Sequence, residues 1–462
     1  MVEKYDVIIV GGGPAGIFAA LELCKASDLK ILIIEKGKDI DDRYCPVRDR
    51  TSSCVLCSPC NVVSGLGGAG AFSDGKLTLS SQVGGQLDSF LGVDSAELLI
   101  KYVDDIYLEF GAPDKLYGMG DEVNEIKRKA SLAELRLIPV PIRHLGTEYC
   151  RLVLKTIRDY LAPHLEFKLE TMVSTIINDG KVSGVETEAG ERFDCRYLIL
   201  APGREGADWL TAEARRLELT IHNNPVDVGI RVEVPVAVME GLTTVLHEAK
   251  LEFISKSFDD RIRTFCMCPA GEVIMETTGG SDPVITVNGH SYATHSSNNT
   301  NFALLVSTNF TEPFREPIAY GKYLARLANI LSGGVLVQRL GDLLAGRRST
   351  SERIKRGLVQ PTLKNAIPGD ISFVMPYRHL SGIIEMLQAI NKLAPGVASL
   401  HTLLYGVEVK FYSCKLQLSS NLETEINNMF AAGDGAGISR GLIEASASGV
   451  VVAREILKRN TY

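Results

Sequence analysis

The sequence predicts an α/β protein in which a dinucleotide-binding domain, built from separate stretches of the chain, is interrupted by an α+β domain. Three observations predict this class. A glycine-rich turn lies between two short apolar runs near the N-terminus, at residues 5–10 and 30–34. Another apolar run covers residues 196–203, and a last one, residues 429–432, leads into a second glycine-rich turn. Short runs of this kind, rich in β-branched residues, are typical of buried parallel strands.

Length and composition set the limits of this prediction. The chain has 462 residues, about three times the ~150 residues of a common domain, so we expect two or three folded parts. Hydrophobic residues make up 45% and charged residues 23%, which excludes disordered, collagen-like and coiled-coil proteins. The net charge is −7 and no run of five or more basic residues is present, so we expect no nucleic-acid partner. With no apolar window long enough for a membrane span, the expected location is cytoplasmic.

The first glycine turn has the pattern and the surroundings of a dinucleotide-binding motif. Residues 11–16 read G-G-G-P-A-G, directly after the first apolar run and before a helical pattern at 17–26. In such a turn the first glycine permits the bend, the second lets the backbone approach a pyrophosphate, and the third lets helix and strand pack closely. We therefore expect these residues at the cofactor: Gly11, Gly13, Pro14, Ala15 and Gly16.

An acidic residue ends the second apolar run. Glu35 follows the glycine turn and its helix at the end of that run, where a carboxylate can accept both hydroxyls of an adenosine ribose. We expect Glu35 and the adjacent Lys36 at the adenosine end of the ligand. This half of the pattern fits NAD and FAD equally.

The later segments of the chain favour FAD over NAD. Gly433 and Asp434 follow the last apolar run, and the Asp434 carboxylate can accept hydrogen bonds from a ribityl chain. The next helix, beginning at Gly441 and Leu442, would direct its positive end at the pyrimidine edge of a flavin. The middle strand closes on Ala201 and Gly203. Three remote segments are thus predicted to converge on one extended FAD, in a Rossmann-like FAD-binding domain of the glutathione-reductase type.

On these motifs the chain resembles the flavoproteins with two dinucleotide-binding motifs. Further stretches resemble, over nearly the whole chain, a family of uncharacterised FAD-dependent dehydrogenases: CVLCSPC, SGLGGAGAFSDGKL, IRHLGTE, TFCMCPAGEV, GVEVKFYS and AAGDGAGISRGLIEASASG. The resemblance implies a bound FAD and a redox activity, and it defines no substrate.

A second glycine-rich stretch at residues 65–70 matches the same pattern by letter. No buried strand precedes it and no strand with a terminal acid follows, so we predict a loop against the flavin and no separate NAD(P)H domain. The residues expected near the cofactor are Gly67, Gly68, Ala69, Gly70, Ser73 and Asp74.

Four of the ten cysteines are clustered between positions 45 and 60: Cys45, Cys54, Cys57 and Cys60. Their spacing leaves four interpretations open, namely a [4Fe-4S] cluster, a tetrathiolate zinc site, a redox dithiol formed by Cys57 and Cys60, and reduced cysteines without a shared role. A bridge between Cys266 and Cys268 is not expected, because a strand rise of ~3.3 Å per residue separates them by about 6.6 Å.

The predicted domain boundaries follow from these patterns. Residues 1–85, 145–218 and 405–462 form the FAD-binding domain, and residues 86–144 form a helical cap with an amphipathic segment at 97–110. Residues 219–404 form the substrate domain, in which Val, Ile and Thr alternate as in an antiparallel sheet and helical segments cover 320–331 and 380–393.

Catalytic residues are the least defined part of the prediction, because a flavin supplies most of the chemistry. The candidates are Lys76, Arg143, His144, Lys410 and Tyr412. The expected reaction moves a hydride between flavin N5 and a small organic substrate, with a diffusible or protein partner as electron donor or acceptor. Two alternatives remain: a flavin and iron-sulfur protein for electron transfer or redox sensing, and a flavin-dependent C=C reductase of the prenyl-lipid type.

Overall fold

The computed structural model describes residues 3–46, 55, 57–222, 224–278, 283–292, 296–308, 316–411, 413 and 415–461. Cys54 and Tyr412 lie outside the described residues. The chain divides into two compact units. Unit 1 comprises Met1–Asp114, Arg143–Asn224 and Ser413–Tyr462, and unit 2 comprises Lys115–Ile142 and Pro225–Tyr412. The segment predicted as a cap is divided between them, since residues 86–114 fall in unit 1 and 115–142 in unit 2.

Unit 1 is built on a mainly parallel sheet. Its parallel strands follow the order β7-β2-β1-β10-β22. They are β1 (Glu3–Val10), β2 (Ile31–Ile34), β7 (Glu166–Lys168), β10 (Arg192–Leu200) and β22 (Met429–Ala431). The antiparallel pair β8 (Val173–Asn178) and β9 (Val182–Thr187) continues the sheet from the first half of β10. All four residues of β2 are buried, as expected for a parallel sheet with both faces covered.

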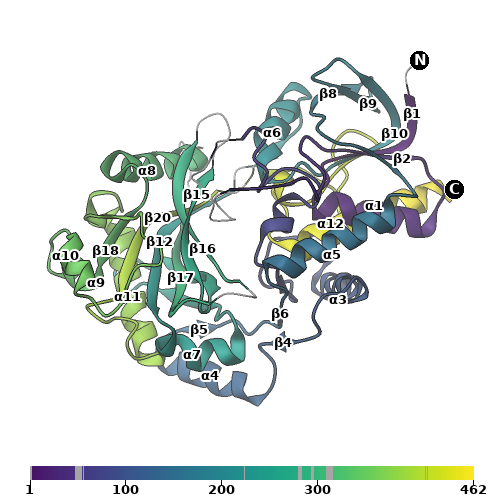
Figure 1. Ribbon diagram of the computed structural model, residues 1–462. Coiled ribbons are helices and arrows are strands. Elements are labelled where there is room, and N and C mark those ends of the chain that lie inside the picture. The colour runs from purple at the N-terminus through teal and green to yellow at the C-terminus, as the bar shows by residue number, and fades with distance from the viewer. Residues whose placement is uncertain are drawn as a thin grey trace. The chain divides into compact units, whose positions relative to one another are not determined.

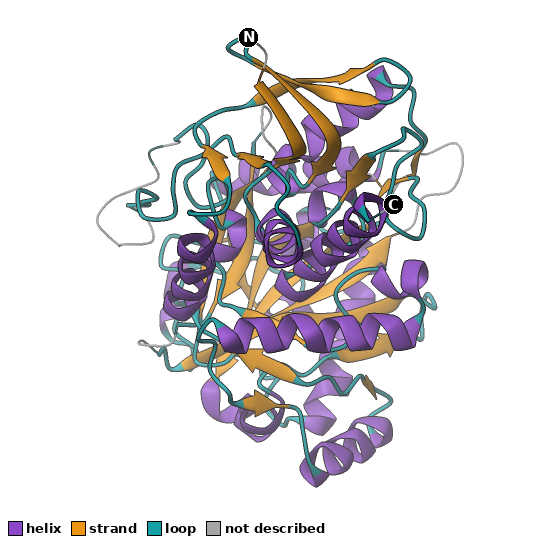
Figure 2. Ribbon diagram, turned by 90° about the vertical axis from the view of Figure 1, so that its right-hand side faces the viewer, coloured by secondary structure: helices purple, strands orange, loops and turns teal. Residues whose placement is uncertain are grey.

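Helices cover this sheet, and Figure 2 shows them beside the strands that follow the N-terminus. The helices of unit 1 are α1 (Pro14–Ala26), α2 (Leu87–Leu91), α3 (Val93–Glu109), α5 (Thr147–Leu161), α6 (Ala207–Arg216) and α12 (Leu442–Asn460), of which α3 packs against α12. The first and last of them, α1 and α12, pack along each other (Figure 1). The approach is close because Gly449 has no side chain: a Cβ there would lie 2.1 Å from the Ala15 carbonyl oxygen.

The strand register brings the chain's remote segments to one edge of the sheet. Val10 is aligned with Ile34 on one side and with Leu200 on the other. Leu200 is in turn aligned with Ala431. Since these strands are parallel, the residues that follow each of them lie at the same carboxyl edge, which is where open α/β sheets bind ligands.

Unit 2 contains an eight-stranded sheet of order β19-β18-β20-β12-β17-β14-β13-β5. It is antiparallel except for the β18 and β19 pair. The strands are β5 (Arg136–Leu137), β12 (Val226–Pro235), β13 (Leu251–Ile254), β14 (Arg261–Cys268), β17 (Asn299–Thr308), β18 (Leu336–Arg339), β19 (Ile367–Pro368) and β20 (Leu403–Lys410). A hairpin of β15 (Glu272–Thr278) and β16 (Val284–His290) stands beside them.

The longer helices of unit 2 are α4 (Asp121–Leu132), α7 (Val236–Leu246), α8 (Pro317–Ser332) and α11 (Tyr377–Leu393). The predicted helical segments at 320–331 and 380–393 fall within α8 and α11. Unit 2 is thus an α+β assembly with its own hydrophobic core, and the predicted fold class is confirmed. Among the described residues, no helix is both long and apolar enough to cross a membrane.

Candidate functional site

The turn after β1 shapes the first part of the site. Gly11 has a φ of +110°, and a Cβ on it would lie 2.1 Å from the Ala201 carbonyl oxygen at the end of β10. A Cβ on Gly16 would lie 2.1 Å from the Gly11 carbonyl oxygen. Only glycine fits at these two positions, because any side chain would enter the backbone of the same turn. The start of α1 is thereby held against the strand ends.

Glu35, directly after β2, is bound by backbone N–H groups and retains acceptor capacity. It is 7% exposed. Its Oε1 accepts from Gly37 N at 2.9 Å and from Gly65 N at 2.9 Å, while Oε2 accepts from Gly12 N at 2.8 Å. A carboxylate offers about four lone-pair sites, so Oε2 can take a further hydrogen bond from a ligand hydroxyl. Lys36 beside it donates to the Glu205 carbonyl at 3.3 Å.

The second glycine stretch lies directly on the first. Gly67 N donates to the Gly12 carbonyl at 2.8 Å, and a Cβ on Gly68 would lie 2.9 Å from Gly13 Cα. Gly70 also makes close contacts. A Cβ on it would lie 3.1 Å from Pro14 Cγ and 2.7 Å from Leu442 Cδ2. Residues 68–72, which include Ala69, form a short 3-10 helix. Two glycine loops far apart in sequence therefore form one backbone-lined surface.

Asp434 follows β22 at the same edge of the sheet. Its Oδ1 accepts a hydrogen bond from Ser439 Oγ at 2.9 Å, and Arg204 Nε lies 3.8 Å from Oδ2. Burial raises the pKa of this carboxyl, and the Arg204 guanidinium opposes that rise. Gly433 has a φ of +77°, and a Cβ on it would lie 3.0 Å from the Cβ of Ala15 in α1. The C-terminal part of the chain thus places a polar acceptor beside the first glycine turn.

Glu444, in the first turn of α12, is a buried carboxyl that the sequence analysis missed. It is 2% exposed, and neither carboxyl oxygen has a hydrogen-bond partner in the described part of the chain. Burial raises its pKa to about 9, helped by the charges of Asp434 and Asp88 and opposed by Arg440. This carboxyl therefore keeps its proton at neutral pH. The sequence feature that could have indicated this carboxyl is its position in the first helical turn after the N-cap glycine Gly441.

Whether an extended dinucleotide fits this edge can be judged from the glycines that border it. A Cβ on Gly13 would meet only the Cα of Gly68, at 3.8 Å, and a Cβ on Gly203 or Gly441 would meet nothing within 4 Å. These positions open onto space that a ligand can approach to backbone distance. Together with the acceptors of Glu35 and Asp434, the described residues fit an FAD.

The cysteine segment is fixed mainly by Arg43. This side chain is 1% exposed and donates to the carbonyls of Asn61, Val62 and Leu66 at 2.8 to 2.9 Å. Burial raises the pKa of the Cys60 thiol, as does the neighbouring Cys57. Among the described residues, neither Cys45 nor Cys57 nor Cys60 belongs to a group of three potential metal ligands. The described part of the segment gives no support to an iron-sulfur or zinc site.

Three catalytic candidates lie in unit 1. Lys76 Nζ pairs with Asp74 Oδ2 at 3.0 Å, and Ser73 Oγ accepts from Gly75 N at 3.1 Å. Arg143 is 2% exposed; it donates to both oxygens of Asp104 at 2.8 Å and to the Pro113 carbonyl at 2.7 Å. Through these contacts the guanidinium ties β6 (Ile142–His144) to α3. His144 is half-buried on β6.

Lys410 lies in unit 2, at the end of β20. Its Nζ contacts Glu408 Oε1 at 3.0 Å, and Glu408 also pairs with Arg231 at 2.7 Å. Glu408 and Arg231 are both fully buried. The alternation that suggested a cavity-lining or solvated face therefore describes a buried ion network, because β20 is covered on both sides.

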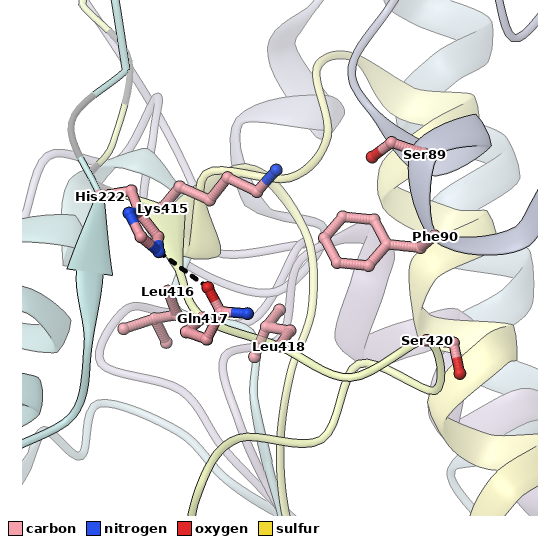
Figure 3. A pocket seen from close by; sticks show the side chains of 8 residues that line it. All are labelled: Ser89, Phe90, His222, Lys415, Leu416, Gln417, Leu418 and Ser420. Atoms are coloured by element: carbon pink, nitrogen blue, oxygen red, sulfur yellow. Dashed lines mark hydrogen bonds between the residues drawn. The ribbon is translucent and has the colours of Figure 1, made fainter.

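Unit 1 also holds a pocket of about 460 Å³ beside the two-stranded pairing of β11 (Ile221–His222) with β21 (Lys415–Leu416). Figure 3 shows Lys415, Phe90 and His222 lining it. The Lys415 ammonium lies 5.0 Å from the centre of the Phe90 ring and donates to Gln86 Oε1. His222 Nε2 lies 2.7 Å from Gln417 Oε1. A cation beside an aromatic ring suits an organic anion with an apolar body.

This pocket is joined to the Asp434 segment by backbone pairing. Gln86 N donates to the Ile438 carbonyl at 3.0 Å, and Gly85 pairs with Ser439 in an isolated bridge. Ser439 is the residue that donates to Asp434. The residues that line the pocket come from three separate segments, so no local sequence pattern indicates it.

Family models match three parts of the chain. Residues 6–41 match the FAD binding domain, residues 225–411 match "FAD-dependent protein, C-terminal domain-like", and residues 370–461 match "Glucose inhibited division protein A". The second of these matches covers most of unit 2, and the first covers the glycine turn and Glu35.

Individual proteins are similar over nearly the whole chain. An "Uncharacterized protein" of Clostridium beijerinckii is 28% identical, covering 99% of this chain and 81% of that protein. Two similar solved structures are a formate oxidase variant of Aspergillus oryzae (14% identical, 99% and 98% covered, TM-score 0.46) and L-proline dehydrogenase from P. horikoshii (13% identical, 99% and 95% covered, TM-score 0.45). At this similarity they say nothing about the substrate. Two of the matched models thus describe FAD: the chain is similar to an FAD binding domain over residues 6–41 and to an FAD-dependent protein over residues 225–411.

Proposed function

We propose that this chain binds FAD along the carboxyl edge of the unit 1 sheet and oxidises or reduces a small organic anion by hydride transfer. Glu35 would hold the adenosine ribose, the two glycine loops and the start of α1 the pyrophosphate, and Asp434 the ribityl chain. The first turn of α12, beginning at Gly441 and Leu442, would meet the ring. Bound flavin supplies a hydride acceptor or donor at N5.

One observation carries the proposal. Two carboxylates with remaining acceptor capacity, Glu35 and Asp434, follow strands β2 and β22 of one parallel sheet, whose register places both at the same edge. Between them lie two contacting glycine loops. FAD presents an adenosine ribose, a pyrophosphate and a ribityl chain in this order, so that the ribityl hydroxyls can donate to the second carboxylate.

The chain's own residues would position the reactants and manage one proton. The N-terminus of α12 favours negative charge nearby. The Glu444 carboxyl is protonated at neutral pH, since burial raises its pKa to about 9. It can therefore act as a proton store in the first turn of that helix. Lys415, beside Phe90, would hold the carboxylate of the substrate.

The first experiment tests cofactor retention. The full-length protein is purified, and the flavin in Asp434→Ala is compared with that in wild type by absorbance and by chromatography of the released cofactor. We expect Asp434→Ala to lose most of its flavin. Asp105→Ala, an exposed aspartate on α3, serves as the matched control and should stay fully loaded. A fully loaded Asp434→Ala would contradict the assigned role.

The second experiment tests the substrate class. Organic anions with aliphatic or aromatic bodies are screened anaerobically for bleaching of the bound chromophore, together with uncharged analogues. We expect bleaching by a subset of the anions, with a higher KM in Lys415→Gln and unchanged flavin content. Bleaching by the uncharged analogues alone would refute the anion assignment and leave the cofactor assignment intact.

The two alternatives have less support. No described observation points to an iron-sulfur centre or to a prenyl-lipid substrate.

A further inference from the structure

Cys266 and Cys268 on β14 are much closer than a regular strand allows. Their Sγ atoms lie 4.0 Å apart. The pairing of β14 with β17 shifts register between Phe265 and Cys268, and Cys266 has a φ of +44°. A bulge of this kind turns two side chains of one strand toward each other. The sequence expectation took the two residues to be about 6.6 Å apart on an unbroken strand. The bulge brings their sulfur atoms closer than that, although the two cysteines form no disulfide in the structure.

A bridge requires the two Sγ atoms to approach each other by about 2 Å more. A disulfide needs its sulfur atoms about 2.05 Å apart, and the bulge already directs both thiols to one point. Cys268 Sγ lies 3.5 Å from the Cys266 carbonyl oxygen. A left-handed φ is unfavourable for a residue with a side chain, so this backbone conformation is maintained by its surroundings.

A buried cation lies beside the pair. Arg231 is fully buried, and its Nη1 donates to the Cys266 carbonyl at 3.1 Å. Burial lowers the pKa of Arg231, but Glu408 and the two thiol groups raise it, and the net direction is upward. The guanidinium thus places a positive charge beside the two cysteines, and the same guanidinium is paired with both carboxyl oxygens of Glu408 at 2.7 and 2.9 Å.

The two thiols differ in access. Cys266 is half-buried, whereas Cys268 is fully buried. This asymmetry is what a dithiol exchange site requires: one thiol that a small molecule can reach and a second that only its neighbour can reach.

We propose that Cys266 and Cys268 form a thiol–disulfide exchange site that reduces small organic disulfides. The Cys266 thiolate attacks one sulfur of the disulfide, its S–S bond breaks, and the first thiol leaves with a solvent proton. Cys268 then loses its proton and attacks the mixed disulfide on Cys266, which releases the second thiol. The dithiol is oxidised by two electrons to a Cys266–Cys268 disulfide, and the small disulfide is reduced to two thiols. No step involves the flavin, so the proposal is independent of the proposed function.

The test uses the full-length holoprotein carrying Cys57→Ser and Cys60→Ser, which removes the other neighbouring thiol pair. The protein is reduced with dithiothreitol, freed of it, and treated with glutathione disulfide. We expect two glutathione molecules released per chain and a peptide containing residues 266–268 that has lost two hydrogen atoms. Flavin absorbance before and after each substitution verifies that the fold is intact.

Single substitutions in the same background test the order of attack. In the Cys268→Ser variant the reaction should stop at the mixed disulfide, with one glutathionyl group on Cys266. The Cys266→Ser variant should react with glutathione disulfide at least tenfold more slowly than the protein with both cysteines. Equal reaction of both variants, no oxidation of the 266–268 peptide, or stoichiometric zinc held by the two thiols without disulfide formation would each refute the proposal. None of these results bears on flavin binding.

Discussion

Gly85 lies directly against the buried carboxyl of Glu444: a Cβ on Gly85 would lie 2.0 Å from Glu444 Oε2. The contact leaves no room for water between the carboxyl and the backbone of the 84–86 segment. Because neither oxygen of Glu444 has a described hydrogen-bond partner, burial strongly favours the protonated, uncharged form of this group.

The first prediction is a pH dependence set by Glu444. Its pKa is raised from 4.5 to about 9, so the folded protein retains a proton that the unfolded chain releases above pH 4.5. Between these values the free energy of unfolding should fall with rising pH, by up to about 1.4 kcal/mol per pH unit. Denaturant unfolding at pH 5, 6, 7 and 8 measures this, with Glu444→Gln as the non-titrating control. Parallel pH profiles for wild type and variant would contradict it.

The second prediction concerns the buried pair of Arg143 and Asp104. Asp104→Ala leaves the Arg143 charge buried without its main partner, which should cost about 3–5 kcal/mol of unfolding free energy. The control is Asp105→Ala on the same helix, which removes the exposed pair with Lys101 at 2.9 Å and should cost less than about 1 kcal/mol.

If Arg143 is structural, turnover per folded, flavin-loaded molecule should not change in Asp104→Ala. A selective loss of turnover with normal unfolding free energy would restore Arg143 as a catalytic candidate.

The third prediction distinguishes the proposed role of Glu35 in binding the adenosine ribose from its role in accepting hydrogen bonds from backbone N–H groups. In Glu35→Gln the three backbone N–H groups and the ribose hydroxyls lose a charged acceptor. Hydrogen bonds to charged groups contribute about 1.5–3 kcal/mol, so FAD affinity should fall roughly 10- to 100-fold. Reconstitution of the apoprotein followed by flavin fluorescence gives the Kd for FAD and for FMN, which lacks the adenosine. An equal loss of affinity for both would indicate a purely structural role.

The fourth prediction compares two glycines inside helices. Gly449→Ala in α12 would place its Cβ 2.1 Å from the Ala15 carbonyl oxygen, so α1 and α12 must move apart. We expect a loss of at least about 2 kcal/mol together with weaker flavin retention. Gly241→Ala in α7 meets nothing within 4 Å and should stabilise the protein by about 0.5–1 kcal/mol through helix propensity. Thermal unfolding of both variants tests the contrast, and similar shifts would contradict it.

The sequence was sufficient for the parts of the fold that depend on local pattern. The order of strand, glycine turn, helix and acid up to Glu35, and the strand before Asp434, predicted elements that the structure contains. Parallel strands have few ways to pair, so residues at their carboxyl ends could be expected at one edge. The second glycine stretch could be distinguished from a further dinucleotide domain by the missing strand before it.

Features that depend on tertiary packing could not be predicted from the sequence. Glu408 and Lys410 have the alternation of a half-exposed strand, yet both faces of β20 are covered. Arg143 next to a histidine resembled a substrate-binding pair, and only the tertiary structure brings Asp104 to it. The burial of Glu444 depends on Gly85, which belongs to a much earlier segment of the chain.

The sequence by itself determined the α/β class, the FAD-binding motif and the convergence of three segments, because periodicity and turn chemistry are properties of neighbouring residues. Only the tertiary structure decided which charged groups are buried and which thiols meet at Cys266 and Cys268. Burial and ion pairing depend on what other segments bring to a residue, and a strand bulge depends on the register of its partner strand.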